Sequence, residues 1–128
     1  SLYSRYIIVD DGYPAARVPS TVPTSLMKRA RFNQTITDLK QDYKAYLNRF
    51  RHYFDRMSQF NQSNIVRLQT GRLLFNGSDT FSWYNPLNGH SRYCDDYHLS
   101  NETFEILRPQ WKIKFDIVFD LLSLVGIR

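Results

Sequence analysis

The stretch DLKQDYKAYLNRFRHYFDRMSQF, residues 38–60, decides the fold that we expect, because its apolar side chains recur with a helical period. From Phe32 to Phe60, two positions of a seven-residue repeat always carry an apolar or aromatic residue, and a third position often does. An apolar arc about 100° wide is what a helix presents to a protein core. We therefore predict one long amphipathic helix that ends at residue 60.

Local signals set the bounds of this helix. Thr35 and Asp38 fit a capping box, although Asp replaces the preferred Glu, so the helix starts at about residue 35 and in a longer alternative at about 25. The polar run Asn61–Asn64 ends it. A helix from Phe32 to Phe60 would be about 43 Å long at a rise of about 1.5 Å per residue. That length exceeds what a chain of 128 residues can cover with its own core.

The N-terminal part of the chain is predicted to be extended. Residues 2–9 are β-branched and aromatic and predict a strand, which Asp10, Asp11 and Gly12 end. Three prolines then prevent a helix over residues 10–24. We expect this segment to be an arm that wraps over a neighbouring surface, either its own or that of a partner.

The C-terminal half is predicted to hold a hairpin and a helix. Residues 65–84 contain two apolar-rich runs around an Asn-Gly turn dipeptide and predict a β-hairpin, with a short helix over 65–75 as the alternative. A short helix precedes Pro109, which suits the first turn of a helix over 109–125; a strand at 111–117 is the alternative. The predicted fold class is α+β, mainly α, in a single domain over residues 1–128.

Composition narrows the class of protein. The chain is basic, with a net charge of +5, and eight basic residues against three acidic ones between 28 and 56 carry that entire excess. No apolar run approaches the roughly 20 residues of a membrane span, so no transmembrane segment is expected. One cysteine favours a reducing compartment. Because the chain begins at Ser1 instead of Met, we expect that a preceding segment was removed by processing or by trimming.

One cluster has the residue types of a metal site. His90, Cys94 and His98 are spaced four and four, so on a helix they would share a face and offer zinc two nitrogens and a sulfur. The spacing matches no established zinc pattern, and a polar loop explains it as well. A nucleophilic Cys94 is disfavoured because the adjacent negative charges of Asp95 and Asp96 would oppose formation of its thiolate. The sequence therefore predicts no enzyme, no metal and no cofactor.

Four sequons indicate glycosylation candidates, at Asn33, Asn61, Asn76 and Asn101. They exceed the roughly one sequon expected by chance, and each falls at the edge of a predicted element. Asn, Ser and Thr also gather at caps and turns for structural reasons, which produces sequons without any glycan. The sequons favour the secretory route, whereas the single cysteine disfavours it.

The helix over 35–60 is predicted to be core in its first half and interface in its second. Leu39, Tyr43, Leu47 and Phe50 lie where the rest of the chain can cover them. The predicted partner-binding residues lie further along and combine aromatic side chains with a basic rim: Arg49, Tyr53, Phe54, Arg56, Met57 and Phe60.

These patterns lead to three hypotheses of function. The first is a non-enzymatic accessory or structural subunit of a larger assembly, in an organelle such as the mitochondrion, that binds other subunits, a membrane surface or an acidic partner through that helix. The second is a secreted or viral-envelope N-glycosylated binding protein. The third and weakest is an RNA-contacting subunit of a ribonucleoprotein, since basic residues are present but an aromatic RNA-binding motif is not.

Overall fold

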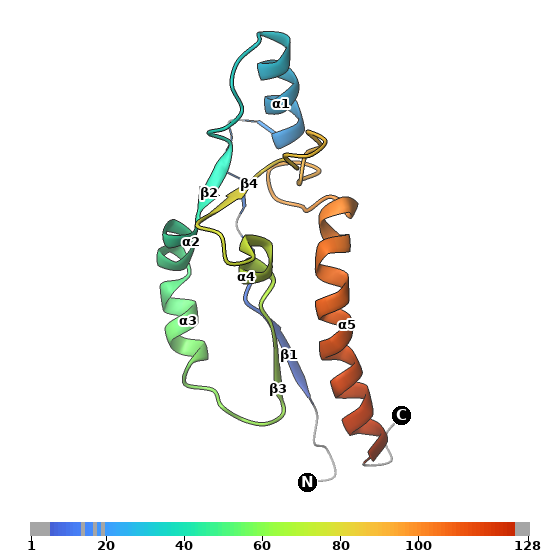
Figure 1. Cartoon of the computed structure of the whole chain (residues 1–128). Coiled ribbons are helices and arrows are strands. Elements are labelled where there is room, and N and C mark those ends of the chain that lie inside the picture. Colours follow the sequence, from blue (N-terminus) through green and yellow to red (C-terminus); the bar gives the residue numbers. More distant parts are fainter. Residues whose placement is uncertain (1–5, 14, 17, 19, 125–128) are drawn as a thin grey trace.

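The computed structural model describes residues 6–13, 15–16, 18 and 20–124, with side chains as far as Asp120. Over these residues the chain is a mixed α/β protein with five helices and two small sheets (Figure 1). In chain order the elements are β1 (Ile7–Asp10), α1 (Val22–Arg31), β2 (Lys40–Asp42), α2 (Tyr43–Arg49), α3 (Arg51–Met57), β3 (Ile65–Leu68), α4 (Thr70–Phe75), β4 (Thr80–Ser82) and α5 (Asn101–Leu124).

Both sheets pair strands that are distant in the sequence. Strands β1 and β3 are parallel, with Ile7 opposite Ile65 and Asp10 opposite Leu68. Strands β2 and β4 are antiparallel, with Gln41 opposite Phe81. The predicted hairpin over 65–84 is therefore wrong. Its two halves are β3 and β4, which belong to different sheets, and α4 lies between them.

The Asn-Gly dipeptide at 76–77 ends a helix instead of turning a hairpin. Asn76 has a φ of 48°, in the left-handed region, and its N–H donates to the carbonyl of Arg72 at 3.0 Å. This conformation is a common way to close a helix, and Asn tolerates it better than most residues. The alternative of a helix within 65–75 is thus correct for the second half of that range.

The predicted long helix is also wrong as a single element, because three shorter helices and a strand occupy its range. Helix α1 ends in a Schellman motif, in which the N–H of Asn33 bonds to the carbonyl of Ala30 and that of Gln34 to the carbonyl of Arg29. Asn33 adopts a φ of 51° there. The chain then crosses to β2 before it becomes helical again at Tyr43.

The second half of the predicted helix is confirmed in a shorter form. Asp42 accepts a hydrogen bond from the N–H of Ala45 at 2.9 Å and so caps α2. Phe50 departs from helical geometry, with φ −98° and ψ 11°, yet its carbonyl still accepts from the N–H of Phe54 at 3.0 Å. Residues 43–57 thus form two short helices joined at one irregular residue.

Helix α5 starts at Asn101, eight residues before the predicted start at Pro109, and it runs through that proline. Proline cannot donate the backbone hydrogen bond to the residue four positions earlier. Pro109 is exposed, so water can solvate the carbonyl that the missing N–H would have satisfied. The alternative of a strand at 111–117 is wrong. None of the described helices is both long enough and apolar enough to cross a membrane.

The arm over residues 10–24 lies on the chain's own surface. The N–H of Ala16 donates to the carbonyl of Asp96 at 2.9 Å, and that of Val22 donates to the carbonyl of Asp95 at 3.1 Å. Ala16 and Val22 are both buried. The arm is shorter than predicted because α1 begins at Val22. Residues 2–5 of the predicted strand, together with 14, 17 and 19 of the arm, lie outside the described residues.

The core gathers around Tyr46, at the level where β2, β4 and α4 meet. Its ring lies 5.3 Å from that of Phe75 and 5.2 Å from that of Phe50, centroid to centroid. Leu39, predicted as core, is 4% exposed, and the other three predicted core residues pack against the cluster in part. The buried members of the core are Ala16, Val22, Leu39, Tyr46, Leu74, Phe75, Phe81, Trp83, Tyr93, Leu99 and Leu107.

Candidate functional site

A buried ion pair lies where β1 ends. The side chain of Asp11 is fully buried, and its Oδ1 accepts from Nη2 of Arg67 at 2.8 Å and from Nε at 3.2 Å. Arg67 comes from β3 and remains 28% exposed. Among the described residues, the second carboxylate oxygen of Asp11 has no hydrogen-bond partner. The sequence predicted only that Asp11 ends a strand, because no local signal connects it to Arg67.

Two tyrosine hydroxyls from the helices reach the same corner. Tyr46 donates to the carbonyl of Gly12 at 3.3 Å, and Tyr53 donates to the carbonyl of Asp10 at 2.9 Å. Burial, and then the nearby carboxylate of Asp11, raise the pKa of both phenols above the ordinary value of 10. Both phenols therefore stay protonated and donate hydrogen bonds at neutral pH. Their geometry ties α2 and α3 to β1, which is a structural role.

The predicted partner-binding residues lie on and beside α3, and they differ in how far they are exposed to solvent. Met57 is buried, while Tyr53 and Phe54 are half-buried. The ring of Phe54 lies 5.9 Å from that of Tyr46, and the Arg72 guanidinium lies 5.3 Å from the Phe54 centroid. The remaining three residues are exposed: Arg49, Arg56 and Phe60. The aromatic side chains of this group thus contribute mostly to the chain's own packing.

The predicted zinc residues do not converge. Nδ1 of His90 lies 2.9 Å from Glu102, whereas Nδ1 of His98 lies 2.7 Å from Asp95, so the two imidazoles pair with different carboxylates. Cys94 is exposed, and its thiol contacts the carbonyl of Leu99 at 3.6 Å. Across the part of the chain that the structure describes, no group of three or more His, Cys, Asp or Glu side chains is arranged to hold a metal ion.

Glu102 instead organises the loop that precedes α5. Its carboxylate accepts from the side-chain amides of Asn85 at 2.7 Å and Asn88 at 3.0 Å, besides its pairing with His90. The hydrogen bond from Asn85, followed by those from His90 and Asn88, lowers the pKa of Glu102 to about 2. The loop so held presents Leu87, whose side chain is 96% exposed.

The four sequon asparagines are all exposed, at Asn33, Asn61, Asn76 and Asn101. Two of them also have a backbone role, because Asn33 and Asn76 adopt the left-handed conformation that closes a helix. Asn101 is the first residue of α5. The structure therefore gives each asparagine access to solvent, and gives two of them a reason to be asparagine without a glycan.

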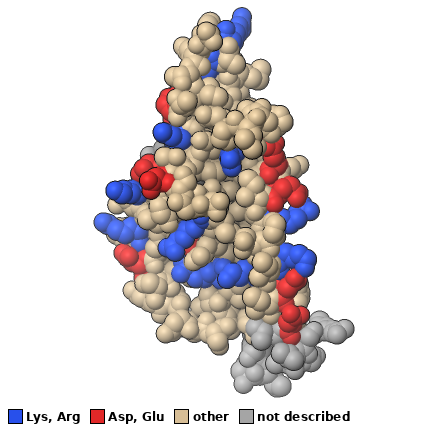
Figure 2. Space-filling view, in the orientation of Figure 1, with Lys and Arg blue, Asp and Glu red and all other residues tan. Residues whose placement is uncertain are grey.

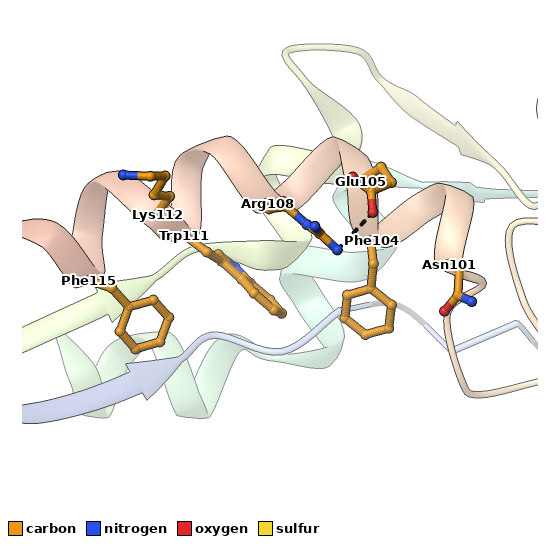
Figure 3. Close-up of a pocket in the computed structure, with 7 residues that line it drawn as sticks. All are labelled: Asn101, Phe104, Glu105, Arg108, Trp111, Lys112 and Phe115. Carbon is orange, nitrogen blue, oxygen red and sulfur yellow. Dashed lines mark ion pairs between the residues drawn. The ribbon is translucent and has the colours of Figure 1, made fainter.

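An open groove runs along one side of α5. Phe104, Trp111 and Phe115 point to the same side of the helix, and the ion pair between Arg108 and Glu105, with atoms 2.8 Å apart, lies beside them (Figure 3). The groove has a volume of about 610 Å³. Among the described residues, the indole N–H of Trp111 has no hydrogen-bond partner. Aromatic walls flanked by exposed charges suit a protein contact better than they suit a reacting group.

Large apolar side chains are exposed on β1 and on the second half of α5. Ile7 is 52% exposed and Ile8 is 39% exposed. On α5, Ile113 and Ile117 are one helical turn apart and close to half exposed, and Phe119 is 62% exposed. Figure 1 shows β1 and β3 beside the second half of α5, which contacts β3. Helical periodicity places Ile113 and Ile117 on the side of α5 away from Phe115, so the five residues lie on several sides of this end of the molecule. Together we call them the β1–α5 apolar surface.

Charge is distributed unevenly over the molecule. On the face drawn in Figure 2, Lys and Arg side chains form a band across the lower half, and Asp and Glu gather along the edges.

Comparison of the chain with family models, with curated proteins and with solved structures finds no match.

Proposed function

We propose that the protein is a non-enzymatic subunit that docks onto a partner chain through the β1–α5 apolar surface. The polar clusters described above support this class, since Asp11 pairs with Arg67 and Glu102 accepts hydrogen bonds from a loop, and both sets of contacts hold the fold together. The observation that carries the proposal is that the sheet of β1 and β3 has only these two strands among the described residues.

A parallel sheet is normally covered on both faces, because its strands are apolar on both sides. Adjacent residues of a strand point to opposite faces, so Ile7 and Ile8 expose apolar surface on both faces of β1. An isolated pair of short strands is marginal in water. A partner that covers these faces would complete a sheet that the described residues leave at two strands.

The outer edge of β1, away from β3, could also pair with another strand at Ile8, whereas at Asp10 the Tyr53 hydroxyl already bonds to the outward carbonyl. The N–H of Ile7 donates to Asn64 at 2.8 Å and that of Asp11 donates to Leu68 at 2.9 Å, so the odd-numbered residues bond to β3. By alternation, the N–H and carbonyl of Ile8 face away from β3. An extended partner segment could pair there, which is a recurrent mode of peptide recognition.

A matched pair of variants tests the strand edge. Ile8→Pro removes the outward N–H and keeps the bonds from β1 to β3, whereas Ile8→Val keeps both. We expect the partner chain that co-purifies in constant ratio with the wild type to be lost from Ile8→Pro and retained by Ile8→Val. Thermal denaturation of both variants checks that the fold persists.

A second pair tests the helix face. Ile117→Asp places a charge inside the proposed interface, and Ile106→Asp places the same charge at an equally exposed residue three helical turns away on the same side of α5, outside the proposed interface. Loss of the partner with Ile117→Asp alone supports the proposal. If light scattering shows a dispersed monomer of 15.3 kDa and no chain co-purifies in constant ratio, the protein is not a subunit of this kind.

The exposure of all four sequon asparagines supports a second candidate, an N-glycosylated binding protein of the secretory route. Intact mass before and after glycosidase treatment of the protein from its own cells tests it. A mass decrease at any of Asn33, Asn61, Asn76 or Asn101 would place the protein in that route and count against an organellar location such as the mitochondrion. An unchanged mass would remove the candidate.

A further inference from the structure

The end of the molecule that carries α1 has two different faces. Val22 is fully buried and Leu26 packs against the core, so one side of the helix is anchored. The other side carries Met27, which is 73% exposed, and ends at Phe32, which is 60% exposed. Figure 1 shows α1 at the extremity of the molecule, far from α3 and from β1. This apolar exposure is therefore separate from the β1–α5 apolar surface.

Basic residues surround the two exposed apolar side chains. Arg31 is four positions after Met27 and three after Lys28, so it neighbours both on the helix. All three side chains line the same hollow. The Arg31 guanidinium lies 5.9 Å from the centroid of the Phe32 ring. Together with Thr24, these four residues line an open hollow of about 500 Å³. We call Met27, Lys28, Arg31 and Phe32 the α1 tip.

Acidic residues are missing from this part of the sequence. There is no Asp or Glu between positions 12 and 37, and the next one, Asp38, forms an ion pair with Arg29. The nearest acidic loop, Asp95 and Asp96, lies at the other end of α1, where the Asp95 carbonyl accepts from Val22. On the face drawn in Figure 2, the extremity that carries α1 shows basic atoms and no acidic ones.

Internal hydrogen bonds hold the α1 tip in one conformation. The Schellman motif at Asn33 fixes the direction in which the chain leaves the helix. Arg29 then donates to the carbonyl of Thr35 at 2.8 Å, which pins the following loop to the helix. Met27 and Phe32 are therefore presented on a rigid support, and a ligand would not need to order them first.

From this combination we propose that the α1 tip docks onto an anionic lipid bilayer. Phe32 and Met27 enter the boundary between headgroups and acyl chains, and Lys28 and Arg31 contact the negative headgroups. Interfacial helices bind in this way, with apolar side chains buried and basic ones at the headgroup level.

The geometry favours a bilayer over an acidic protein. The α1 tip lies at the protruding end of the molecule, and its hollow is open. A fluid bilayer adapts to a protruding apolar side chain, whereas a protein partner would need a matching pocket for each of the two. The charge is modest, so the expected attachment is reversible and adds to whatever the partner chain supplies.

Flotation of the full chain with lipid vesicles tests the proposal. We expect binding to vesicles of phosphatidylcholine mixed with phosphatidylserine, little binding to phosphatidylcholine alone, and a decrease with added salt, because salt screens exposed charges. Removal of one basic side chain should weaken partitioning about fivefold. Charge reversal of both, in Lys28→Glu with Arg31→Glu, should abolish it.

Matched controls separate the α1 tip from general electrostatic attraction. Lys44→Glu changes the net charge as much as Lys28→Glu does, but at an exposed position on α2, and should weaken binding far less. Met27→Ser with Phe32→Ser leaves the charge unchanged and should weaken binding about tenfold through lost apolar burial. Ile106→Ser, on α5, removes a comparable apolar side chain and should have little effect.

Insertion itself has a spectroscopic readout. In Phe32→Trp, the added emission should shift to shorter wavelength with phosphatidylserine vesicles and be quenched by lipids brominated on their acyl chains. Binding that is equal on neutral vesicles, or unaffected by the reversal at Lys28 and Arg31, overturns the proposal. Binding that needs the charges but is indifferent to Met27→Ser with Phe32→Ser, and that polyglutamate competes away, would instead assign the α1 tip to an acidic protein.

Discussion

The hydroxyl of Tyr53, on α3, donates a 2.9 Å hydrogen bond to the main-chain carbonyl of Asp10, at the end of β1. The contact joins residues that are 43 positions apart in the chain. It attaches the second half of the aromatic stripe to the sheet, so α3 is not a free helix end. The hypothesis that Tyr53 and its neighbours bind a partner stays a prediction, and any such partner would meet a helix whose inner side is already occupied.

Replacing Tyr53 by Phe should lower the free energy of unfolding by about 0.5–1.5 kcal/mol, which is the net contribution of a typical hydrogen bond. The ring itself stays, so packing against Phe54 is preserved. Chemical denaturation of the variant beside Tyr97→Phe, an exposed tyrosine, gives the comparison. Equal stability of the two variants would show that the hydroxyl of Tyr53 bonds to water instead of to Asp10.

Removing either partner of the buried ion pair should destabilise the fold, but by different amounts. Arg67→Met leaves the fully buried carboxylate of Asp11 without its cation and should cost about 3 kcal/mol or more. Asp11→Asn should cost less, because Arg67 is 28% exposed and can be solvated by water. Urea denaturation measures both. The double variant should cost less than the two single changes together, and strict additivity would show that the pair does not interact.

Gly71 is expected to resist the substitution that usually stabilises a helix. In an open helix, Gly→Ala stabilises by about 1 kcal/mol. At Gly71 an added Cβ would overlap the hydroxyl of Tyr46 and lie 2.7 Å from the carbonyl oxygen of Gly12, which is backbone and cannot move aside easily. Gly71→Ala should therefore destabilise by about 1–3 kcal/mol in thermal or chemical denaturation. A stabilised variant would contradict the close approach of α4 to Tyr46.

Glu102 should make stability depend on acid. Its pKa in the fold is about 2, below the ordinary value of 4.5, chiefly because Asn85 donates to it. As pH falls from 4.5 towards 2, the unfolded chain binds a proton at this carboxyl before the folded chain does. The stabilisation is therefore complete above that window and is lost progressively within it.

The free energy of unfolding, measured at several pH values in that window, should fall more steeply for the wild type than for Glu102→Gln. Glu105→Gln is the matched control, since Glu105 is exposed on the next turn and pairs with Arg108. A wild-type slope equal to that of Glu102→Gln would show that the loop from Asn85 to His90 does not hold the carboxylate in solution.

The sequence was informative where local signals decide structure and uninformative where distant segments do. The first strand was found from its β-branched and aromatic residues and the last helix from its helical period, and both are properties of a few consecutive residues. The hairpin failed because β3 pairs with β1 and β4 with β2, and no turn dipeptide reports such distant pairings. The seven-residue aromatic repeat is not interrupted at β2, although the chain is not helical there. Leu39, just before β2, and Tyr46, in α2, both face the core and keep the spacing of the repeat.

The candidate sites also divide into those marked by local sequence and those formed by distant segments. The exposed sequons and the basic segment were visible in the sequence. The ion pair of Asp11 with Arg67 joins residues 56 positions apart, and the exposure of Ile8 or Phe32 depends on what the fold leaves uncovered. The α1 tip was also concealed by the long predicted helix, since Phe32 was assigned to its core-facing stripe.

Replacing Asp42 by Ala should change the free energy of unfolding in opposite directions in a broken helix and in a continuous one. Inside a continuous helix, Asp42→Ala would stabilise, because Ala has the higher helix propensity. In the structure, Asp42 caps α2 through the N–H of Ala45, so the same change should destabilise by about 1 kcal/mol. Asn48→Ala, at an exposed position inside α2, should be neutral or stabilising and serves as the control. If chemical denaturation shows Asp42→Ala to be as stable as Asn48→Ala or more so, the helix runs through residue 42 and β2 does not form.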